Sequence, residues 1–373
     1  MSEIASSVAI ELTEAHHALE TRAAEFAREH IAPREDEESD AFGIEMTQKL
    51  GAAGLLDPCV DLDVRGICLV RETVGQYSGL IDSMVALQGL GYAPIELAGS
   101  DAQKNQWREK VRTGQAIPAF AITEPTAGSD VGNLKTTATR EGDEWVLNGE
   151  KCFITNAGIA DFYLTFARTS DDGSRGISAF LVPADKVEVT ERFELMAPHP
   201  CGALRYDNVR VPADALVGEV GDGFKTAMST LDRFRATVGA ASLGLAKRAL
   251  DEGIRRAKER EQFGKPISRY QQIGAMLADS WAELMAARLL VYRAAAARDA
   301  SQGDAGLLAS AAKMLSTEFA QKIIDRSVQI HGGMGVKRGT TVERLYREVR
   351  ALRIYEGTTE IQRVVISRGL LRG

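Results

Sequence analysis

The apolar residues of this chain change their spacing twice, and this pattern constrains the fold more than any other feature. In the first part they recur at helical intervals, as in the segment 13–31, which ends before Pro33. From Ile117 the spacing changes to the two-residue period of β-strands. After residues 218–223 the helical period returns in four long segments. The sequence therefore predicts a helical part, then a β part, then a second helical part.

The predicted elements divide the chain into three domains. Further N-terminal helices are predicted at 45–55, 65–78, 82–98 and 101–113, the last with Ser100 as a candidate cap. A β-hairpin over 135–147, with its turn at Glu141–Glu144, and β-rich runs at 161–169, 176–182 and 204–211 form the middle. The last four helical segments are 222–259, 268–301, 305–330 and 341–368. We predict an α+β multidomain protein with an all-α domain (1–116), a β-barrel-like or sandwich domain (117–220) and a four-helix bundle (221–373).

Composition excludes several classes of protein. At 373 residues and 45% apolar content the chain can bury a sizeable core, and its net charge of −7 argues against nucleic acid or anionic membranes as partners. No apolar run approaches the roughly 18 residues of a membrane span, and Met1–Glu20 is acidic without a signal-peptide core. The four cysteines show no CxxC spacing, and the histidines form no metal-binding pair. We predict a cytoplasmic protein with reduced thiols and no metal.

Glu356 lies in a short, glycine-containing break between two helical stretches. Apolar residues at helical spacing precede the break in Val342–Arg353 and resume after it at Ile361. A carboxylate placed at such a joint by backbone geometry can serve as a general base. From the residues alone, a surface glutamate before a turn is the alternative interpretation.

Five short motifs occur along the chain in one order. They are Thr123–Asp130 (TEPTAGSD), Phe153–Asn156 (FITN), Arg260–Gly264 (REQFG), Gln329–Gly333 (QIHGG) and Ile354–Thr359 (IYEGTT). In this order and at these separations they resemble the motifs of the acyl-CoA dehydrogenase family. The resemblance extends from about Glu11 to Leu371 and weakens at 55–70 and 194–205.

The resemblance implies an FAD cofactor. The residues that match cofactor-binding positions of the family are Thr123, Ser129, Phe153, Thr155, Arg260, Phe263, Gln329, Gly333, Thr358 and Glu360. Thr123 and Thr155 match groups that hydrogen-bond the flavin ring, and Phe153 stands where relatives often have Trp. From the residues alone, such threonines could equally be ordinary strand residues, and Arg260 could bind helix-terminal carbonyls as readily as phosphate.

The resemblance also implies the substrate side of the site. Candidate substrate-binding residues are Ser83, Ala86, Leu87, Leu90, Ser129, Asp232, Arg235, Tyr355 and Gly357. Asp232 and Arg235 match residues that contact CoA. Some branches carry the catalytic glutamate one residue before that arginine, but here the residue is Phe234, which cannot abstract a proton. Glu356 is therefore the only motif-supported base, and burial beside an acyl chain should raise its pKa.

The implied function is FAD-dependent α,β-dehydrogenation of an acyl-CoA to the trans-2-enoyl thioester, with Glu356 removing the α-proton and flavin N5 accepting the hydride. An electron-transferring flavoprotein as electron acceptor and a homotetramer or dimer are implied with it. An acyl-carrier-protein thioester as substrate, an oxygen-using acyl-CoA oxidase and, less favoured, a DNA-associated flavoprotein remain alternatives. Departures from the family at the connection Asp57–Asp63 and at Leu195–Cys201, together with small residues on the helix Ser83–Gly91, favour a short, branched or cyclic acyl group over a long straight one.

Overall fold

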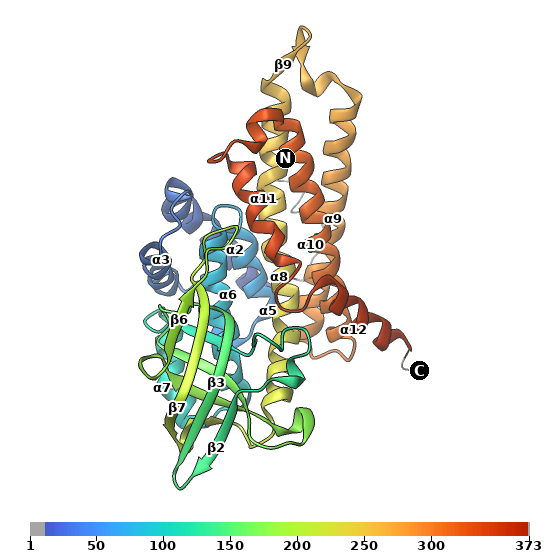
Figure 1. Cartoon of the computed structure of the whole chain (residues 1–373). Coiled ribbons are helices and arrows are strands. Elements are labelled where there is room, and N and C mark those ends of the chain that lie inside the picture. Colours follow the sequence, from blue (N-terminus) through green and yellow to red (C-terminus); the bar gives the residue numbers. More distant parts are fainter. Residues whose placement is uncertain (1–11, 372–373) are drawn as a thin grey trace. The chain divides into compact units, whose positions relative to one another are not determined.

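The computed structural model describes residues 12–371 and contains two compact units, each built from separate stretches of the chain (Figure 1). The first unit comprises Met1–Asp36, Val64–Asp82 and Asp232–Gly373, and the second comprises Glu37–Asp63 and Ser83–Leu231. The first is helical, whereas the second combines helices with a mixed β-sheet.

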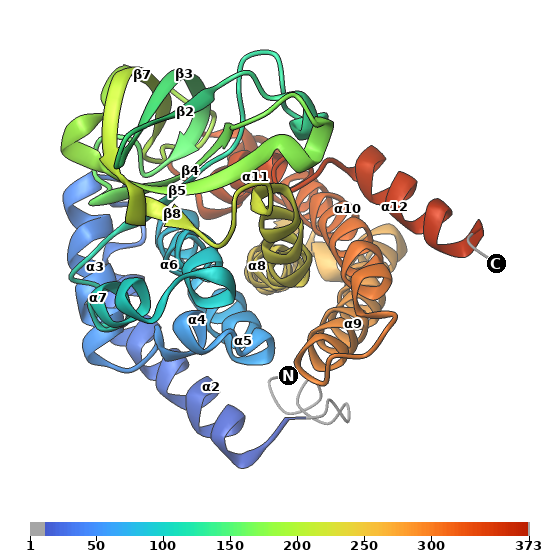
Figure 2. The same cartoon turned by 90° about the horizontal axis from the view of Figure 1, so that it is seen from below.

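The helices of the first unit enclose one apolar core. They are α2 (Glu14–Phe26), extended by the π-helical turn Ala27–Ile31, α5 (Val64–Val74), α8 (Gly223–Glu259, from Asp232 on), α9 (Gln271–Asp299), α10 (Ala305–His331), α11 (Thr341–Leu352) and α12 (Thr359–Leu371). The long helices α8, α9 and α10 run side by side in both views (Figures 1 and 2). Their facing rows are rich in alanine, as at Ala240, Ala294 and Ala312, so the helices can approach closely.

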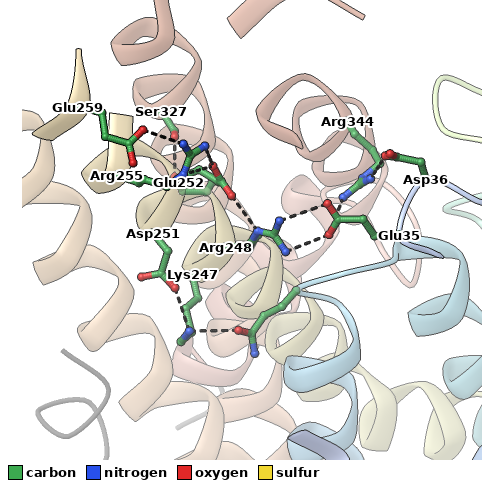
Figure 3. A network of polar contacts seen from close by, with 12 residues as sticks. Glu35, Asp36, Lys247, Arg248, Asp251, Glu252, Arg255, Glu259, Ser327 and Arg344 are labelled. Carbon is green, nitrogen blue, oxygen red and sulfur yellow. Dashed lines mark hydrogen bonds and ion pairs between the residues drawn. The ribbon is translucent and has the colours of Figure 1, made fainter. Parts of the chain in front are cut away.

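Ion pairs join the separate stretches of the first unit (Figure 3). Arg248 of α8 binds the carboxylate of Glu35 through both terminal nitrogens, at 3.0 and 3.2 Å, and its Nε lies 3.3 Å from Glu252. Arg344 of α11 is buried and pairs with Glu35 at 3.4 Å and closely with Asp36. The segment after α2 is thereby tied to α8 and α11, and bidentate arginine contacts give this connection a defined geometry.

The second unit is built around an eight-stranded mixed sheet. Its helices are α3 (Asp40–Ala52), α4 (Asp57–Asp61), α6 (Gly79–Ala98, from Ser83 on) and α7 (Asp101–Arg112). Its strands are β1 (Pro118–Ala121), β2 (Thr137–Glu141), β3 (Glu144–Thr155), β4 (Phe162–Arg168), β5 (Ile177–Pro183), β6 (Glu188–Arg192), β7 (Cys201–Pro212) and β8 (Leu216–Val217). The order is β6-β7-β3-β2-β4-β5-β8, with β1 parallel to β4, and the register of β3 on β7 shifts between Lys151 and Ile154.

Most sequence-predicted elements are confirmed. The hairpin forms between β2 and β3 with Gly142 at a positive φ of 58° in its turn, and the Ser100 side chain caps α7 by accepting a bond from the Gln103 backbone N–H at 3.3 Å. The last predicted helical segment is interrupted between Leu352 and Thr359, as the glycine-containing break predicted. The helix–β–helix order of the predicted fold class is thus observed, while the three domain boundaries stay predictions.

The structure adds a helix that the sequence did not predict, in the connection Asp57–Asp63. This connection contains the short helix α4, in which Pro58 occupies the first turn, where its missing N–H costs nothing. Pro58, Cys59 and Val60 are buried, so tertiary packing stabilises a helix too short to be stable alone. Among residues 12–371, no helix is long and apolar enough to span a membrane.

Candidate active site

Glu356 lies in the joint between α11 and α12 with an uncommon backbone conformation. Its φ is 52°, and that of Gly357 is 89°, so the backbone of both residues has a positive φ, as in the left-handed region. For a glutamate this conformation is strained, and strained positions concentrate at functional sites. The sequence predicted the break, and the structure adds that Glu356 has a positive φ within it.

Two buried side chains hold the carbonyl groups of this joint. Lys313 Nζ donates to the Gly357 carbonyl oxygen at 2.7 Å. Gln362 Nε2 donates to the same oxygen at 2.9 Å and to the Glu356 carbonyl oxygen at 3.2 Å. A Cβ added to Gly357 would lie 2.6 Å from Gln362 Nε2, so glycine is required there by both conformation and space.

A second set of contacts ties the two ends of the joint together. Thr359 donates its backbone N–H to the Arg353 carbonyl oxygen at 3.1 Å and its hydroxyl to Glu318 Oε1 at 3.0 Å. Arg353 Nε donates to the same Glu318 oxygen at 2.9 Å. The joint is therefore fixed from α10 at two places, Lys313 and Glu318, and this preorganises Glu356.

The carboxylate of Glu356 is partly withdrawn from solvent. Its Oε2 atom is covered and has no hydrogen-bond partner among the described residues. Burial raises the pKa of Glu356, while the positive charges of Arg71, Lys313 and Arg235 oppose the rise. A carboxylic acid with a raised pKa is better matched to proton abstraction near neutral pH, in agreement with the expectation from the sequence.

Arg71 is a buried cation on the same unit. Its Nε and Nη2 donate to the two carboxylate oxygens of Asp82, both at 2.8 Å, and its Nη1 donates to Thr237 Oγ1 at 2.8 Å. Only 1% of Arg71 is exposed. Burial alone would lower the pKa of Arg71, but the charge and hydrogen bonds of Asp82 raise it well above its usual range, so Arg71 stays ionised.

In the second unit, one end of β3 lies against the loop after β1. Cys152 donates its backbone N–H to the Thr123 carbonyl oxygen at 3.0 Å, so Thr123 lies beside Phe153. Phe153 has a φ of 54°, is 64% exposed and packs on the ring of Phe193, with centroids 4.9 Å apart. Thr123 and Thr155 are half-buried. An exposed aromatic ring beside polar strand-end groups is suited to a flat heteroaromatic ligand.

A buried ion pair supports this part of the second unit. Lys151 Nζ lies 2.8 Å from Glu124 Oε1 and donates to the Ile122 carbonyl oxygen at 3.2 Å. Glu124 also accepts the Thr136 backbone N–H at 2.9 Å. These bonds bracket Thr123 on both sides and fix its backbone. Burial lowers the pKa of Lys151 to about 8, and Glu124 opposes this shift.

Comparison with known proteins decides the family. Three family models match in succession: the N-terminal domain of acyl-CoA dehydrogenases over residues 13–115, the middle domain over 119–209 and the C-terminal domain over 221–371. The chain belongs to the acyl-CoA dehydrogenase family. Acyl-CoA dehydrogenases are FAD-dependent oxidoreductases, so the predicted family, enzyme class and cofactor are confirmed, together with the fold class of helical, β and helical parts.

Individual relatives cover nearly the whole chain. The probable acyl-CoA dehydrogenase FadE25 of Mycobacterium tuberculosis is 37% identical over 97% of this chain and 96% of its own. The caffeyl-CoA reductase-Etf complex subunit CarC of Acetobacterium woodii is 40% identical over 89% of this chain and 87% of its own. Among solved structures, butyryl-CoA dehydrogenase from Megasphaera elsdenii superposes with a TM-score of 0.92 at 32% identity, covering 98% of this chain and all of the other.

Asp232 and Arg235, predicted to contact CoA, pair closely with each other in this acyl-CoA dehydrogenase. Arg235 is buried, and its Nε has no hydrogen-bond partner among residues 12–371. Asp232 also lines a groove of about 360 Å³. The groove is further lined by Gly303, Gly306, Leu307, Val365, Arg368 and Gly369. An open groove with a carboxylate and a guanidinium can accept a polar, charged chain.

Other predicted residues near the joint have local structural roles. The Thr358 hydroxyl accepts the Ile361 backbone N–H at 3.3 Å and so caps α12. Hydrogen bonds from its own backbone N–H and from Thr358 lower the pKa of Glu360 in the first turn of that helix. Tyr355 exposes 38% of its surface and is available to a ligand. A cofactor role for Thr358 and Glu360 stays a prediction.

The remaining predicted residues differ in exposure. On α6, Ser83 is half-buried, whereas Ala86, Leu87 and Leu90 are buried with 4 to 7% exposed. Ser129 is exposed in the loop after β1. The predicted adenine-end residues Arg260, Phe263, Gln329 and Gly333 are all exposed on the first unit.

Phe263 is 94% exposed. It lies with Gly264 at the tip of the hairpin formed by β9 (Glu261–Gln262) and β10 (Lys265–Pro266), at one end of the unit (Figure 1). A large apolar ring so fully exposed at a hairpin tip is typical of a contact surface.

Sequence reasoning missed Arg71, Lys313 and Gln362. Arg71 and Lys313 lie on buried helical rows whose other members include apolar and small residues, and Gln362 is buried near the start of α12. A charged residue on the buried face of a helix is rare unless it is paired, and this could have indicated the two cations. Nothing in the local sequence indicates their partners. Among the described residues no group of acidic, histidine or cysteine side chains could hold a metal ion.

Proposed function

We propose that this acyl-CoA dehydrogenase removes the α-proton of an acyl-CoA thioester with Glu356 and forms the trans-2-enoyl thioester. The observation that carries the proposal is the Glu356 carboxylate itself. It lies at a strained joint, has one covered oxygen without a hydrogen-bond partner among residues 12–371, and has a pKa raised by burial. Structural glutamates are usually paired or solvated, whereas a base must keep an oxygen free for the proton it accepts.

The residues around Glu356 support proton abstraction. Lys313 and Gln362 hold the backbone of the joint, so the carboxylate is anchored at a fixed point. The neighbouring cations Arg71, Lys313 and Arg235 favour the ionised form of Glu356 and so oppose the effect of its burial. A weakly acidic proton α to a thioester carbonyl is thus met by a preorganised carboxylate whose basicity is strengthened by partial desolvation.

The second unit supports the cofactor assignment. The exposed Phe153 ring suits stacking on a flavin, and the half-buried Thr123 and Thr155 offer hydroxyl and backbone groups at its edge. FAD, when bound, supplies the acceptor for the β-hydride. In this proposal the chain's own residues orient the ring, and Glu124 with Lys151 holds the loop that carries Thr123.

A short, branched or cyclic acyl group is the proposed substrate. Leu87 and Leu90 of α6 provide apolar surface, while Ser83 and Ala86 are small enough to leave width for a branch. Each methylene of a long chain that found a buried place would add roughly 0.8 kcal/mol, or about fourfold in affinity. If the proposed acyl pocket is only deep enough for a short chain, further methylenes are not buried and add no affinity.

Anaerobic addition of acyl-CoAs to the FAD-loaded enzyme tests both the dehydrogenation and the preference for short, branched or cyclic acyl groups. Bleaching of the flavin absorbance is expected with isobutyryl-, butyryl- or cyclic acyl-CoA, and kcat/KM should stop rising after the short chains. A steady rise from C4 to C12 straight chains would contradict the proposed pocket. If no acyl-CoA bleaches the flavin but acyl-carrier-protein thioesters do, the acyl group is carried by an acyl carrier protein and not by CoA.

The electron acceptor is proposed to be an electron-transferring flavoprotein. This rests on the relative CarC, which is named as a subunit of a complex with such a flavoprotein. Rapid reoxidation of the bleached enzyme by oxygen in place of an added flavoprotein would instead favour an oxidase.

A homotetramer or dimer in which FAD is shared between subunits is proposed from the exposed residues of the first unit. If Arg260 binds the pyrophosphate of a neighbour's cofactor, Arg260→Ala should lower FAD occupancy and weaken the oligomer together, because the cofactor stabilises the state that binds it. Sedimentation velocity of holo and apo protein, with flavin absorbance, measures both. Arg255→Ala, five residues earlier, near the end of α8, and 57% exposed, is the matched control and should change neither. A monomeric variant with full FAD occupancy would contradict the shared site.

A further inference from the structure

We infer that Lys313 is a positioning residue for Glu356, which orients the joint through the Gly357 carbonyl and supplies the positive charge that favours the ionised base. This inference rests on the proposed role of Glu356. Lys313 lies in the middle of α10 and is fully buried. Its neighbours on the buried row are Ala309, Ala312 and Ser316, so only a specific partner can offset the cost of burying an ammonium group there.

The partner is the joint that carries the base. The peptide plane before Gly357 contains the Glu356 carbonyl, and the plane after it contains the Gly357 carbonyl. Gln362 donates to the first oxygen at 3.2 Å and to the second at 2.9 Å, and Lys313 donates to the second at 2.7 Å. Lys313 contributes the shorter bond and the only charged donor of the two. Charge-assisted hydrogen bonds are stronger than neutral ones, so Lys313 is the stronger anchor.

The charge of Lys313 acts on the base as well. Burial lowers the pKa of Lys313 to about 8, and the facing carboxylates of Glu356, Glu360 and Glu318 oppose this shift, whereas Arg235 adds to it. Near neutral pH the ammonium form therefore predominates. An ammonium group close to a carboxylate favours the ionised form that abstracts a proton.

Other charged groups face Glu356 from the surrounding helices. Arg71 of α5 and Arg235 of α8 favour its ionised form, and Asp82 of α6 disfavours it. Arg71 is neutralised by a bidentate bond to Asp82, and Arg235 is paired with Asp232. Lys313 differs because it donates to a neutral carbonyl and forms no direct ion pair among residues 12–371, so no adjacent carboxylate cancels its positive charge near Glu356.

The test compares the pH dependence of kcat in three variants. Lys313→Met removes charge and donor, Lys313→Gln keeps a donor without charge, and Lys313→Arg keeps both. Loss of the charge should raise the pKa of Glu356, so the acid limb of kcat should move to higher pH in the Met and Gln variants and stay in place in the Arg variant. Lys322→Met removes an exposed lysine of the same helix and should leave the profile unchanged.

A purely structural role would lower kcat in all three variants without moving the acid limb, and that result would overturn the inference. Flavin absorbance and thermal unfolding identify any variant that is not folded. If Lys313→Met does not fold, Lys313→Gln decides the outcome by the same measurement. Turnover by Glu356→Gln would instead show that the proposed base is wrong. If Glu356→Gln is inactive but the acid limb of kcat does not move in the Lys313 variants, the role of Lys313 is rejected and the role of Glu356 is retained.

Discussion

Glu356→Gln is expected to retain bound FAD and to lose dehydrogenation by roughly 10²–10⁴-fold or more, the usual worth of a general base. The amide preserves the size of the side chain and leaves the joint intact, because the bonds from Lys313 and Gln362 go to backbone carbonyls. Single-turnover flavin bleaching under anaerobic conditions isolates the chemical step. Glu109→Gln, at a side chain that is 67% exposed on α7, is the control. Turnover within tenfold of wild type would reject Glu356 as the base.

The same variant is expected to unfold at a higher temperature near neutral pH. The pKa of Glu356 is raised above its ordinary value of 4.5 in the folded protein. Its neutral form therefore favours folding below pH 4.5, and this contribution is lost as pH rises through the folded pKa. Glutamine stays neutral at every pH, so the variant does not lose this contribution to stability as pH rises. Melting temperatures of the two holoenzymes should converge toward pH 4.5 and separate above it; a wild type more stable at pH 7.5 would contradict the sign.

Arg71→Met is expected to destabilise the protein by about 3–5 kcal/mol, because it leaves the buried Asp82 carboxylate without its partner. The pair is well suited to this test: the side chains are 1% and 7% exposed, and two hydrogen bonds of 2.8 Å join them. Denaturant titration of the holoenzyme measures the loss. Arg71→Met combined with Asp82→Leu should recover most of it, since the desolvation cost of both charges disappears together.

Lys247→Met provides the control for this pair. Lys247 and Asp251 lie 3.0 Å apart in the network of Figure 3, but their side chains are 40% and 49% exposed. Solvent screens such a pair, and the expected cost is less than about 1 kcal/mol. Equal losses for Lys247→Met and Arg71→Met would show that burial does not set the cost of breaking an ion pair here.

Much of the fold could be predicted because apolar spacing records which face of each element is buried. The break at residues 353–358 was predicted for this reason: helical spacing stops before Ile354, and Gly357 follows. The helix α4 was not predicted, because Pro58 at its first turn and three buried residues make sense only once the rest of the second unit packs on them. Short elements depend on tertiary contacts more than on their own propensity.

For this acyl-CoA dehydrogenase, the sequence by itself determined the order of elements, the family and the base candidate Glu356. Spacing and motifs are local properties, and local backbone chemistry such as the glycine after Glu356 can be read from them. The tertiary structure alone decided that Lys313, 44 residues before Gly357, binds its carbonyl, and that Arg71 pairs with Asp82. The pKa of Glu356 depends on these charges and on burial. Electrostatic interactions act through space, so residues far apart in the sequence set the chemistry of Glu356 only after the chain has folded.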